Sequence, residues 1–388
     1  MMTSLACDAS RFLSDCTGSP CVNGSCVCDA GFTGPYCNKL KVGDAVRAVE
    51  LKDTWLWGSA AIQDPVTKTY HSFTMAQKNK CGIWHYRHNS VIYHSTSTSV
   101  LGPYQYQGIA LDNRSEGFFD AVEVEDPSVI ALPNGTGYLL FYTGAAYPFP
   151  APPGKHIGRL NCSAHDVEPE PDRDLLAAGQ RIGVAFAKSL SSTPIKWERP
   201  SGLPILTTRP TKWDSIRVCN PAPLIFPNGT ALLAYRGVGP HHAGIGIAKA
   251  PHWSGPYEPL LDAPLFNGYA EDPFLFLSPT GVIHLIAHGG GKMPNATSVG
   301  IHAASLDGIN WGSPRDCYDY YCDWAKGVPP ASLGRRETPE LLLDTTNGQP
   351  LALFNSAAPC KCNYFDKRQE CLWGEQCETF SMAVEVLR

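Results

Sequence analysis

The sequence lacks the features of a membrane-spanning or nucleic-acid-binding protein. No apolar run approaches the ~18 residues that a spanning helix needs, which argues against membrane insertion. Lysine and arginine total 31 against 36 acidic residues, a net charge of −5, and no basic block stands out. This balance argues against a nucleic-acid partner. Helical periodicity is also scarce, with one short candidate at 172–178.

Turn formers and cysteines are abundant instead. The 388 residues include 36 glycines and 33 prolines, which favour many turns over long helices. Fifteen cysteines are too many for an ordinary cytosolic enzyme and indicate an oxidising compartment. Asn-x-Ser/Thr sequons, the acceptors of N-glycosylation, occur at Asn23, Asn113, Asn134, Asn161, Asn228 and Asn295. We therefore expect a secreted or secretory-pathway glycoprotein, although no signal peptide is visible in this chain.

A compact cysteine cluster opens the chain, at Cys7, Cys16, Cys21, Cys26, Cys28 and Cys37. The run from Cys26 to Cys37 has the spacing C-x-C-x-x-G-aromatic-x-G-x-x-C and resembles an EGF-like module. The resemblance implies the pairs Cys7–Cys21, Cys16–Cys26 and Cys28–Cys37, whereas spacing alone leaves the connectivity open. Residues 1–38 form this module, with no calcium-binding acids before Cys7. It serves either as a contact to protein or matrix or as a cap on the next domain.

The rest of the chain repeats one unit five times. Each copy has a short apolar strand, a tight turn and a second strand, which is a β-hairpin signal, and a third strand follows in most copies. The copies align at Gly58, Asp126, Asn220, Asp272 and Thr338, four of which precede proline. An aromatic-Asp pair precedes two of these positions, at 119–120 and 213–214. A Pro-rich insertion at about 145–179 lengthens one interval.

Repeated small sheets at this spacing predict an all-β fold, a five-bladed β-propeller. We expect it to span 53–388, after a linker at 39–52. The aligned Asp-Pro steps and the run at 304–311 resemble the propellers of glycoside hydrolase families 43 and 32 and their relatives. This resemblance implies a carbohydrate substrate.

Propeller topology brings the first residues of each inner strand to one central funnel. The carboxyl groups expected there are Glu125, Asp126, Glu271, Asp272 and Glu337. Clustered carboxyl groups differ in pKa, and glycosidic cleavage needs one acid and one carboxylate. We therefore predict Asp126, Glu271, Asp272 and Glu337 as catalytic. The residues predicted to bind substrate are Trp57, Glu125, Asn220, Arg236, His242, His288 and Arg336.

The resemblance to family 43 has a gap. That family implies a base on the first blade, a pKa-tuning Asp on the second and an acid on the third. This chain has Gly58 and Asn220 at the first and third positions, so only Asp126 matches. Either the hydrolytic site is rearranged, or the funnel binds sugar without cleaving it.

The leading hypothesis is a glycoside hydrolase that inverts configuration. Asp272 or Glu271 would then act with Glu337, and Asp126 would tune their pKa values. A lectin-like binding protein is the alternative, and a polysaccharide lyase or transglycosylase using the same funnel is a third class. No cofactor is required, and the metal content is unknown, although an axial ion such as calcium is compatible with a funnel histidine. Cys317 and Cys322 are expected to form disulfides with cysteines from 360–377, and Cys219 is the funnel thiol.

Overall fold

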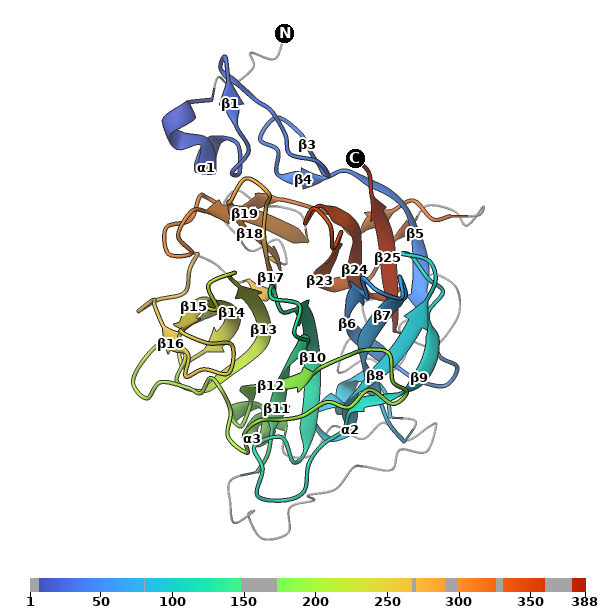
Figure 1. Cartoon of the computed structure of the whole chain (residues 1–388). Coiled ribbons are helices and arrows are strands. Elements are labelled where there is room, and N and C mark those ends of the chain that lie inside the picture. Colours follow the sequence, from blue (N-terminus) through green and yellow to red (C-terminus); the bar gives the residue numbers. More distant parts are fainter. Residues whose placement is uncertain are drawn as a thin grey trace.

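The structure is a computed structural model. It describes residues 7–79, 81–147, 173–266, 270–289, 299–325, 331–359 and 379–388. Five antiparallel sheets surround a central axis and form the predicted five-bladed propeller, with the N-terminal module above them in Figure 1. None of the helices in these residues has the length and apolar character that a membrane crossing requires.

The strands of blades one to four run outward from the axis in chain order. Blade one contains β6 (Leu56–Gln63), β7 (Tyr70–Gln77), β8 (Ser90–Ser97) and β9 (Gln105–Leu111). Blade two contains β10 (Glu123–Ala131), β11 (Tyr138–Ala145) and β12 (Arg181–Ala187). Blade three contains β13 (Arg217–Ile225), β14 (Ala231–Val238), β15 (Ala243–Ala250) and β16 (Glu258–Pro259). Blade four contains β17 (Glu271–Leu277), β18 (Ile283–His288), β19 (Gly300–Ser305) and β20 (Arg315–Asp316).

Blade five joins the two ends of the propeller. Its strands are β23 (Arg335–Leu343), β24 (Pro350–Ala358), β25 (Phe380–Val386) and β5 (Val42–Val49), in that order across the sheet. β5 pairs antiparallel with β25, so the strand nearest the N-terminus completes the last blade. The expected linker at 39–52 is therefore wrong over Val42–Val49, which is part of the ring.

The aligned positions of the five copies share one backbone conformation. Gly58, Asp126, Asn220, Asp272 and Thr338 all have positive φ, between 48° and 55°. The pairing register of each inner strand also shifts at this point, which marks a β-bulge. Gly, Asp and Asn tolerate this left-handed conformation, whereas it strains the β-branched Thr338. The bulges explain why the repeat is visible in the sequence.

The aromatic-Asp pairs of blades two and three have a structural role. Asp120 is fully buried and accepts a hydrogen bond from the hydroxyl of Tyr142 at 2.8 Å, and Asp214 accepts one from Tyr235 at 2.7 Å. Arg114 and Arg209 complete the two arrangements at 2.6 and 3.0 Å. Each pair fastens the segment before the inner strand to the second strand of its blade.

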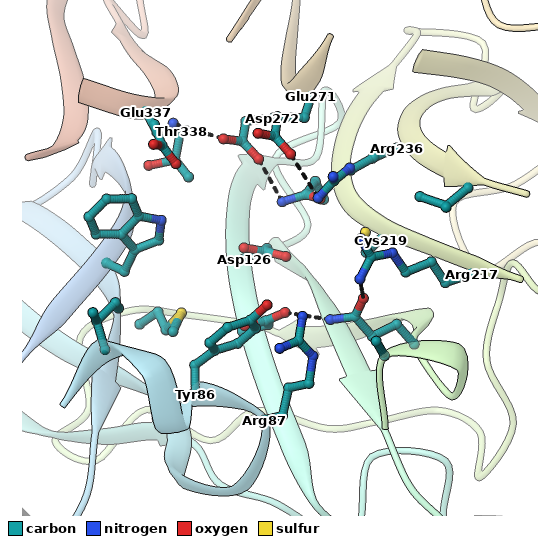
Figure 2. A pocket seen from close by; sticks show the side chains of 18 of the residues that line it. Tyr86, Arg87, Asp126, Arg217, Cys219, Arg236, Glu271, Asp272, Glu337 and Thr338 are labelled. Carbon is teal, nitrogen blue, oxygen red and sulfur yellow. Dashed lines mark hydrogen bonds and ion pairs between the residues drawn. The ribbon is translucent and has the colours of Figure 1, made fainter. Parts of the chain in front are cut away.

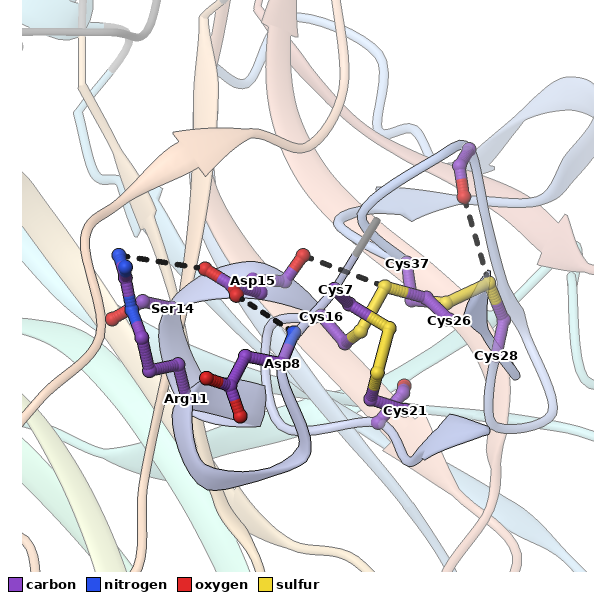
Figure 3. The surroundings of a disulfide bond; sticks show 12 residues. Cys7, Asp8, Arg11, Ser14, Asp15, Cys16, Cys21, Cys26, Cys28 and Cys37 are labelled. Carbon is purple, nitrogen blue, oxygen red and sulfur yellow. Dashed lines mark hydrogen bonds and ion pairs between the residues drawn. A yellow bond between two sulfur atoms is a disulfide. The ribbon is translucent and has the colours of Figure 1, made fainter. Parts of the chain in front are cut away.

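The N-terminal module has the disulfides that the EGF resemblance implied. Cys7–Cys21, Cys16–Cys26 and Cys28–Cys37 are all formed, so this pairing is confirmed (Figure 3). The remaining structure is sparse. It consists of the helical turns η1 (Ala9–Arg11) and α1 (Phe12–Asp15) and two small hairpins, β1 (Cys21–Val22) with β2 (Ser25–Cys26) and β3 (Phe32–Thr33) with β4 (Lys39–Leu40).

The module packs directly against blade four. The ring of Phe32 stacks on His302 and His284, with centroids 4.7 and 5.8 Å away, and joins the hydrophobic core of blades four and five. The backbone oxygen of Asn38 lies 3.1 Å from Nδ1 of His302. A Cβ atom on Gly18 would lie 2.7 Å from Val282, so the two surfaces are in close contact there. The module therefore shares a core with the propeller.

The cysteines outside the module differ from expectation. Cys317 and Cys322 are buried free thiols, so the expected disulfides at these two positions are wrong. The guanidinium of Arg336 donates to Sγ of Cys322 at 3.2 Å. Cys81 is disulfide-bonded. The cysteines of 360–377 lie outside the described residues.

Short elements interrupt the blades at the end where the inner strands begin. η2 (Ile83–His85) and α2 (Tyr86–Asn89) precede β8, and α3 (Arg173–Ala178) ends the Pro-rich insertion close to the expected 172–178. A small sheet of β21 (Tyr321–Cys322) and β22 (Ala331–Ser332) precedes blade five.

The described sequons differ in accessibility. Asn134 and Asn228 are exposed in hairpin turns at the end of the blades away from the inner-strand starts, and Asn23 is also exposed. Asn113 is half-buried, and its amide donates to the carbonyl of Ala121 at 2.8 Å. Asn161 and Asn295 lie outside the described residues.

The substitution Phe32→Ala should destabilise the protein. It removes a side chain that is 6% exposed and bridges the module to blade four, so we expect a loss of about 3 kcal/mol in the free energy of unfolding. Urea denaturation measures this loss. Val27→Ala, at a 53% exposed position of the same module, is the control and should change little. Equal stability of the two variants would contradict the shared core.

Candidate functional site

A polar pocket opens where the inner strands begin. Its volume is about 490 Å³, and residues from all five blades and from α3 line it. Figure 2 shows Glu271, Asp272 and Glu337 on one side, Tyr86 and Arg87 on the opposite side, and Asp126 between them. The predicted residues Trp57, Glu125, Asp126, Asn220, Arg236, Glu271, Asp272 and Glu337 all line this pocket.

Glu271 lies in a charge network on blade four. Its Oε2 is 2.7 Å from the guanidinium of Arg236, which projects from β14 of blade three. Its Oε1 is 3.3 Å from Nδ1 of His288, at the end of β18. Burial would lower the pKa of His288, but the hydrogen bond with Glu271 and the charges of Glu337, Glu271 and Asp272 raise it to about 9. His288 is therefore a cation at neutral pH and holds the adjacent carboxyl groups together.

Asp272 lies next to this pair and is held by two donors. Oδ1 accepts from the amide of Asn220 at 2.8 Å, and Oδ2 accepts from the backbone N–H of Thr338 at 3.2 Å. Burial, followed by the charge of Glu271, raises the pKa of Asp272 well above its ordinary value. Asn220 thus fixes the orientation of a blade-four carboxyl group from blade three.

Glu337 is the blade-five carboxylate of the pocket. Arg335 donates to both of its oxygens, at 2.9 and 3.2 Å. The same guanidinium lies 4.7 Å from the ring centroid of Trp57, so it links blade five to the blade-one wall. This bidentate contact fixes the carboxylate in a single orientation.

On blade two, Asp126 occupies the position that aligns with Asp272 and Thr338. Its Oδ2 accepts from the hydroxyl of Thr143 on β11 at 3.0 Å, and the same hydroxyl accepts from the backbone N–H of Asn220. Burial is the largest influence on Asp126 and raises its pKa to about 7. A carboxyl group with this pKa is partly protonated near neutrality, as general acid catalysis requires.

Glu123 and Glu125 form a carboxyl pair on blade two, and only Glu125 was predicted from the sequence. Glu123 is fully buried beside Glu125, and the side-chain amide of Gln180 donates to both, at 2.6 and 2.8 Å. Burial, then the charges of Glu123 and Asp126, raise the pKa of Glu125 well above its ordinary value. The signal for Glu123 was present in the sequence, because residues two apart on a strand share a face. Gln180 offered no comparable signal.

Blade one supplies an apolar wall instead of an acid. Trp57, Met75 and Ile83 form one cluster, with Tyr86 packed against it, and all four line the pocket. A Cβ atom on Gly58 would lie 3.9 Å from both Pro127 of blade two and Thr338 of blade five. Gly58 contributes no acid, and the part of blade one that lines the pocket is an apolar surface on which a sugar ring can pack.

Three predicted binding residues, Arg336, His242 and His288, do not line the pocket. His288 contacts it through Glu271. Arg336 is 2% exposed, donates to Asn355 at 2.9 Å and stacks on the ring of Tyr318. Its neighbour Arg335 faces the pocket instead, because successive strand residues point to opposite sides. His242 is exposed and does not line the pocket. Arg87 and Arg217, which do line it, were not predicted.

Cys219 lines the pocket but is not an activated nucleophile. Burial outweighs the charges of Arg217 and Arg236 and raises the pKa of its thiol to about 12. The thiolate required for nucleophilic attack is therefore scarce at neutral pH.

One group of pocket residues could approach a metal ion. Ligand atoms of Glu271, Asp272, His288 and Glu337 all lie within 4.8 Å of one another. Calcium prefers six to eight oxygen ligands, and a protonated imidazole is not a ligand. Arg236 and Arg335 already occupy the carboxylates of Glu271 and Glu337. This set does not fit calcium well, because an ion would have to displace a proton and two guanidinium groups.

Comparison with known proteins supports the fold. No protein-family model and no curated protein sequence matches the chain. Among solved structures, Zg3597, a family 117 glycoside hydrolase of the marine bacterium Zobellia galactanivorans, has a TM-score of 0.58 at 13% identity, over 90% of each chain. A further glycoside hydrolase has a TM-score of 0.52 at 12% identity, over 88% of this chain and 90% of the other. An endo-arabinase from Bacteroides thetaiotaomicron VPI-5482 has a TM-score of 0.50 at 11% identity, over 87% of this chain and 96% of the other. The chain therefore has the fold of these propeller glycoside hydrolases.

Proposed function

We propose that the protein is a glycoside hydrolase whose funnel cleaves an oligo- or polysaccharide. The observation that carries the proposal is the convergence of carboxyl groups from blades two, four and five on one pocket, opposite an apolar wall. Some of these groups have raised pKa values and others are paired with arginine, so the pocket offers both an acid and a base. The fold of the structural neighbours is consistent with this chemistry.

We assign the acid to Asp126 and the base to Glu337. These residues come from the two blades on either side of blade one, and both line the pocket together with Trp57. Asp126, with its pKa of about 7, donates a proton to the leaving oxygen. Glu337, oriented by Arg335, accepts a proton from the attacking water.

The sequence favoured Asp272 or Glu271 as the partner of Glu337. Inverting enzymes need about 6.5–9.5 Å between the two carboxyl groups to admit a water. Ligand atoms of Glu271, Asp272 and Glu337 lie within 4.8 Å, which argues against an inverting pair among them. In this proposal Asp272 and Glu271 bind sugar hydroxyls, and the charge of Glu271 adds to the burial that raises the pKa of Asp126.

Binding without cleavage is the second candidate. It is favoured by Gly58 and Asn220, which replace the acids that the family 43 resemblance implies at those positions. A lyase or transglycosylase would use the same pocket but release different products.

Secretion and glycosylation remain part of the proposal. The three disulfides of the module indicate an oxidising compartment, and Asn23, Asn134 and Asn228 are exposed acceptors. The outer surface of the module is available for a protein or matrix contact.

Asp126→Asn should abolish hydrolysis while preserving the fold. Loss of the general acid is expected to lower kcat by a factor of about 10² to 10⁴. The measurement is release of reducing sugar from a broad glycan panel. Asp262→Asn, which changes an 83% exposed side chain, is the matched control and should retain full activity.

Product analysis separates the candidate functions. New reducing ends indicate hydrolysis, absorbance from an unsaturated uronate indicates elimination, and retention on a glycan column without products indicates a binding protein. Full turnover by Asp126→Asn would exclude Asp126 as the acid.

The pH profile should report the same residue. Since Asp126 must be protonated, kcat/KM should fall above about pH 7, by about tenfold per pH unit, as the carboxyl group of Asp126 ionises. Initial rates between pH 5 and 9 on the best substrate measure this fall in kcat/KM. A profile flat to pH 9 would contradict the assignment.

Metal removal should leave hydrolysis unchanged. The carboxylates of Glu271 and Glu337 are paired with arginine, so we expect kcat/KM to survive dialysis against a chelator. Loss of activity on dialysis, with recovery on adding calcium, would instead assign an ion to the axis.

A further inference from the structure

Arg217 differs from the other arginines of the pocket. It begins β13 of blade three and lines the pocket. One N–H of its guanidinium donates to the side-chain carbonyl of Gln180 at 3.3 Å. Its Nε is buried with no hydrogen-bond partner, and the guanidinium forms no ion pair with any carboxylate in the described part of the chain. Most of its donor capacity is therefore unused.

The remaining pocket arginines are already engaged. Arg236 pairs with Glu271 at 2.7 Å, and Arg335 pairs with Glu337 through two hydrogen bonds. Arg87 stacks on the ring of Tyr86 and acts electrostatically on Glu125. These three arginines interact with carboxyl groups of the pocket, whereas Arg217 pairs with none among the described residues.

The surroundings of Arg217 favour binding of an anion. Ile216, Val238 and two alanines of α3 line the same pocket as Arg217, and α3 also contributes Asp174. Apolar neighbours reduce screening by water, so an ion pair formed there is stronger than one at the surface. A partly buried guanidinium without a counter-ion is costly, and a ligand carboxylate or sulfate would remove that cost through two parallel hydrogen bonds.

We propose that Arg217 binds an acidic substituent of the glycan, so that the substrate is a uronate-containing or sulfated saccharide. This inference rests on the proposed function, because it names the substrate class for the same pocket. A neutral hydroxyl would accept from only one donor of the planar guanidinium, whereas a carboxylate or sulfate can accept two parallel N–H hydrogen bonds from it. The acidic substituent lies on the blade-three side, and the sugar that is cleaved lies toward blade one.

The experiment compares acidic saccharides with their neutral counterparts. The probes are uronate oligosaccharides with their carboxyl-reduced forms, and sulfated oligosaccharides with their desulfated forms. We expect the protein to bind at least one acidic member about ten- to a hundredfold more tightly than its neutral counterpart. Arg217→Met should abolish that preference, and Arg217→Lys should restore only part of it. The member that is preferred distinguishes a carboxylate from a sulfate ester.

Two controls identify the effect as recognition. Arg11→Met removes an arginine whose side chain is 69% exposed and should leave the preference intact. Thermal unfolding with inorganic sulfate reports anion binding without any glycan. Because sulfate stabilises folded proteins in general, it should raise the Tm of the wild type more than that of Arg217→Met. Equal affinity for every acidic and neutral pair would overturn the proposal. An equal loss for acidic and neutral members in Arg217→Met would also overturn it, since Arg217 would then act only through Gln180.

Failure of this inference can be told apart from failure of the proposed function. Hydrolysis of neutral glycans alone would support the proposed hydrolase function and exclude an acidic substrate. Preferential binding of acidic glycans without any products would support Arg217 as the anion site and exclude the hydrolase function.

Discussion

The left-handed bulge at the start of each inner strand is the constraint on which the pocket depends. It lies at Gly58, Asp126, Asn220, Asp272 and Thr338, and these residues with their neighbours surround a narrow channel on the axis. Positive φ turns the backbone so that polar side chains collect around the axis while the following residues continue into buried sheet. The strained Thr338 donates its backbone N–H to Asp272 and thereby contributes to the site.

Several carboxylates in one pocket would repel one another, and the structure reduces this repulsion in two ways. On blades four and five, Arg236, Arg335 and His288 neutralise Glu271 and Glu337. Burial favours protonation of Asp126 and Glu125 on blade two and of Asp272 on blade four, so that charge is avoided. The pocket therefore contains both fixed carboxylates and protonated carboxyl groups, and the proposed hydrolysis uses one of each.

The sequence predicted the fold and part of the site for a physical reason. Every blade needs the same backbone turn, so the residues that tolerate it recur and reveal the repeat. Glu271, Asp272 and Asp126 follow from that register, although their roles remain predictions. Side-chain direction at a bulge does not follow, which is why Arg336 was expected in place of Arg335. Gln180 reaches the pocket from the end of an insertion, and no periodic pattern in the sequence predicts its position. The pairing of β5 with β25 depends on closure of the whole ring, which local patterns do not encode.

The order of strands in blade five also governs how the chain acquires its structure during synthesis. β25 (Phe380–Val386) lies between β24 and β5, and it is synthesised after every other strand that the structure describes. The three disulfides of the N-terminal module can form while most of the propeller is still unmade. β5, although made early, has as β-pairing only the bridge from Ala45 to Trp324 until Phe380–Val386 has been synthesised. A nascent chain therefore exposes an unpaired edge at Val42–Val49 throughout translation, and a product truncated before residue 380 retains that edge permanently.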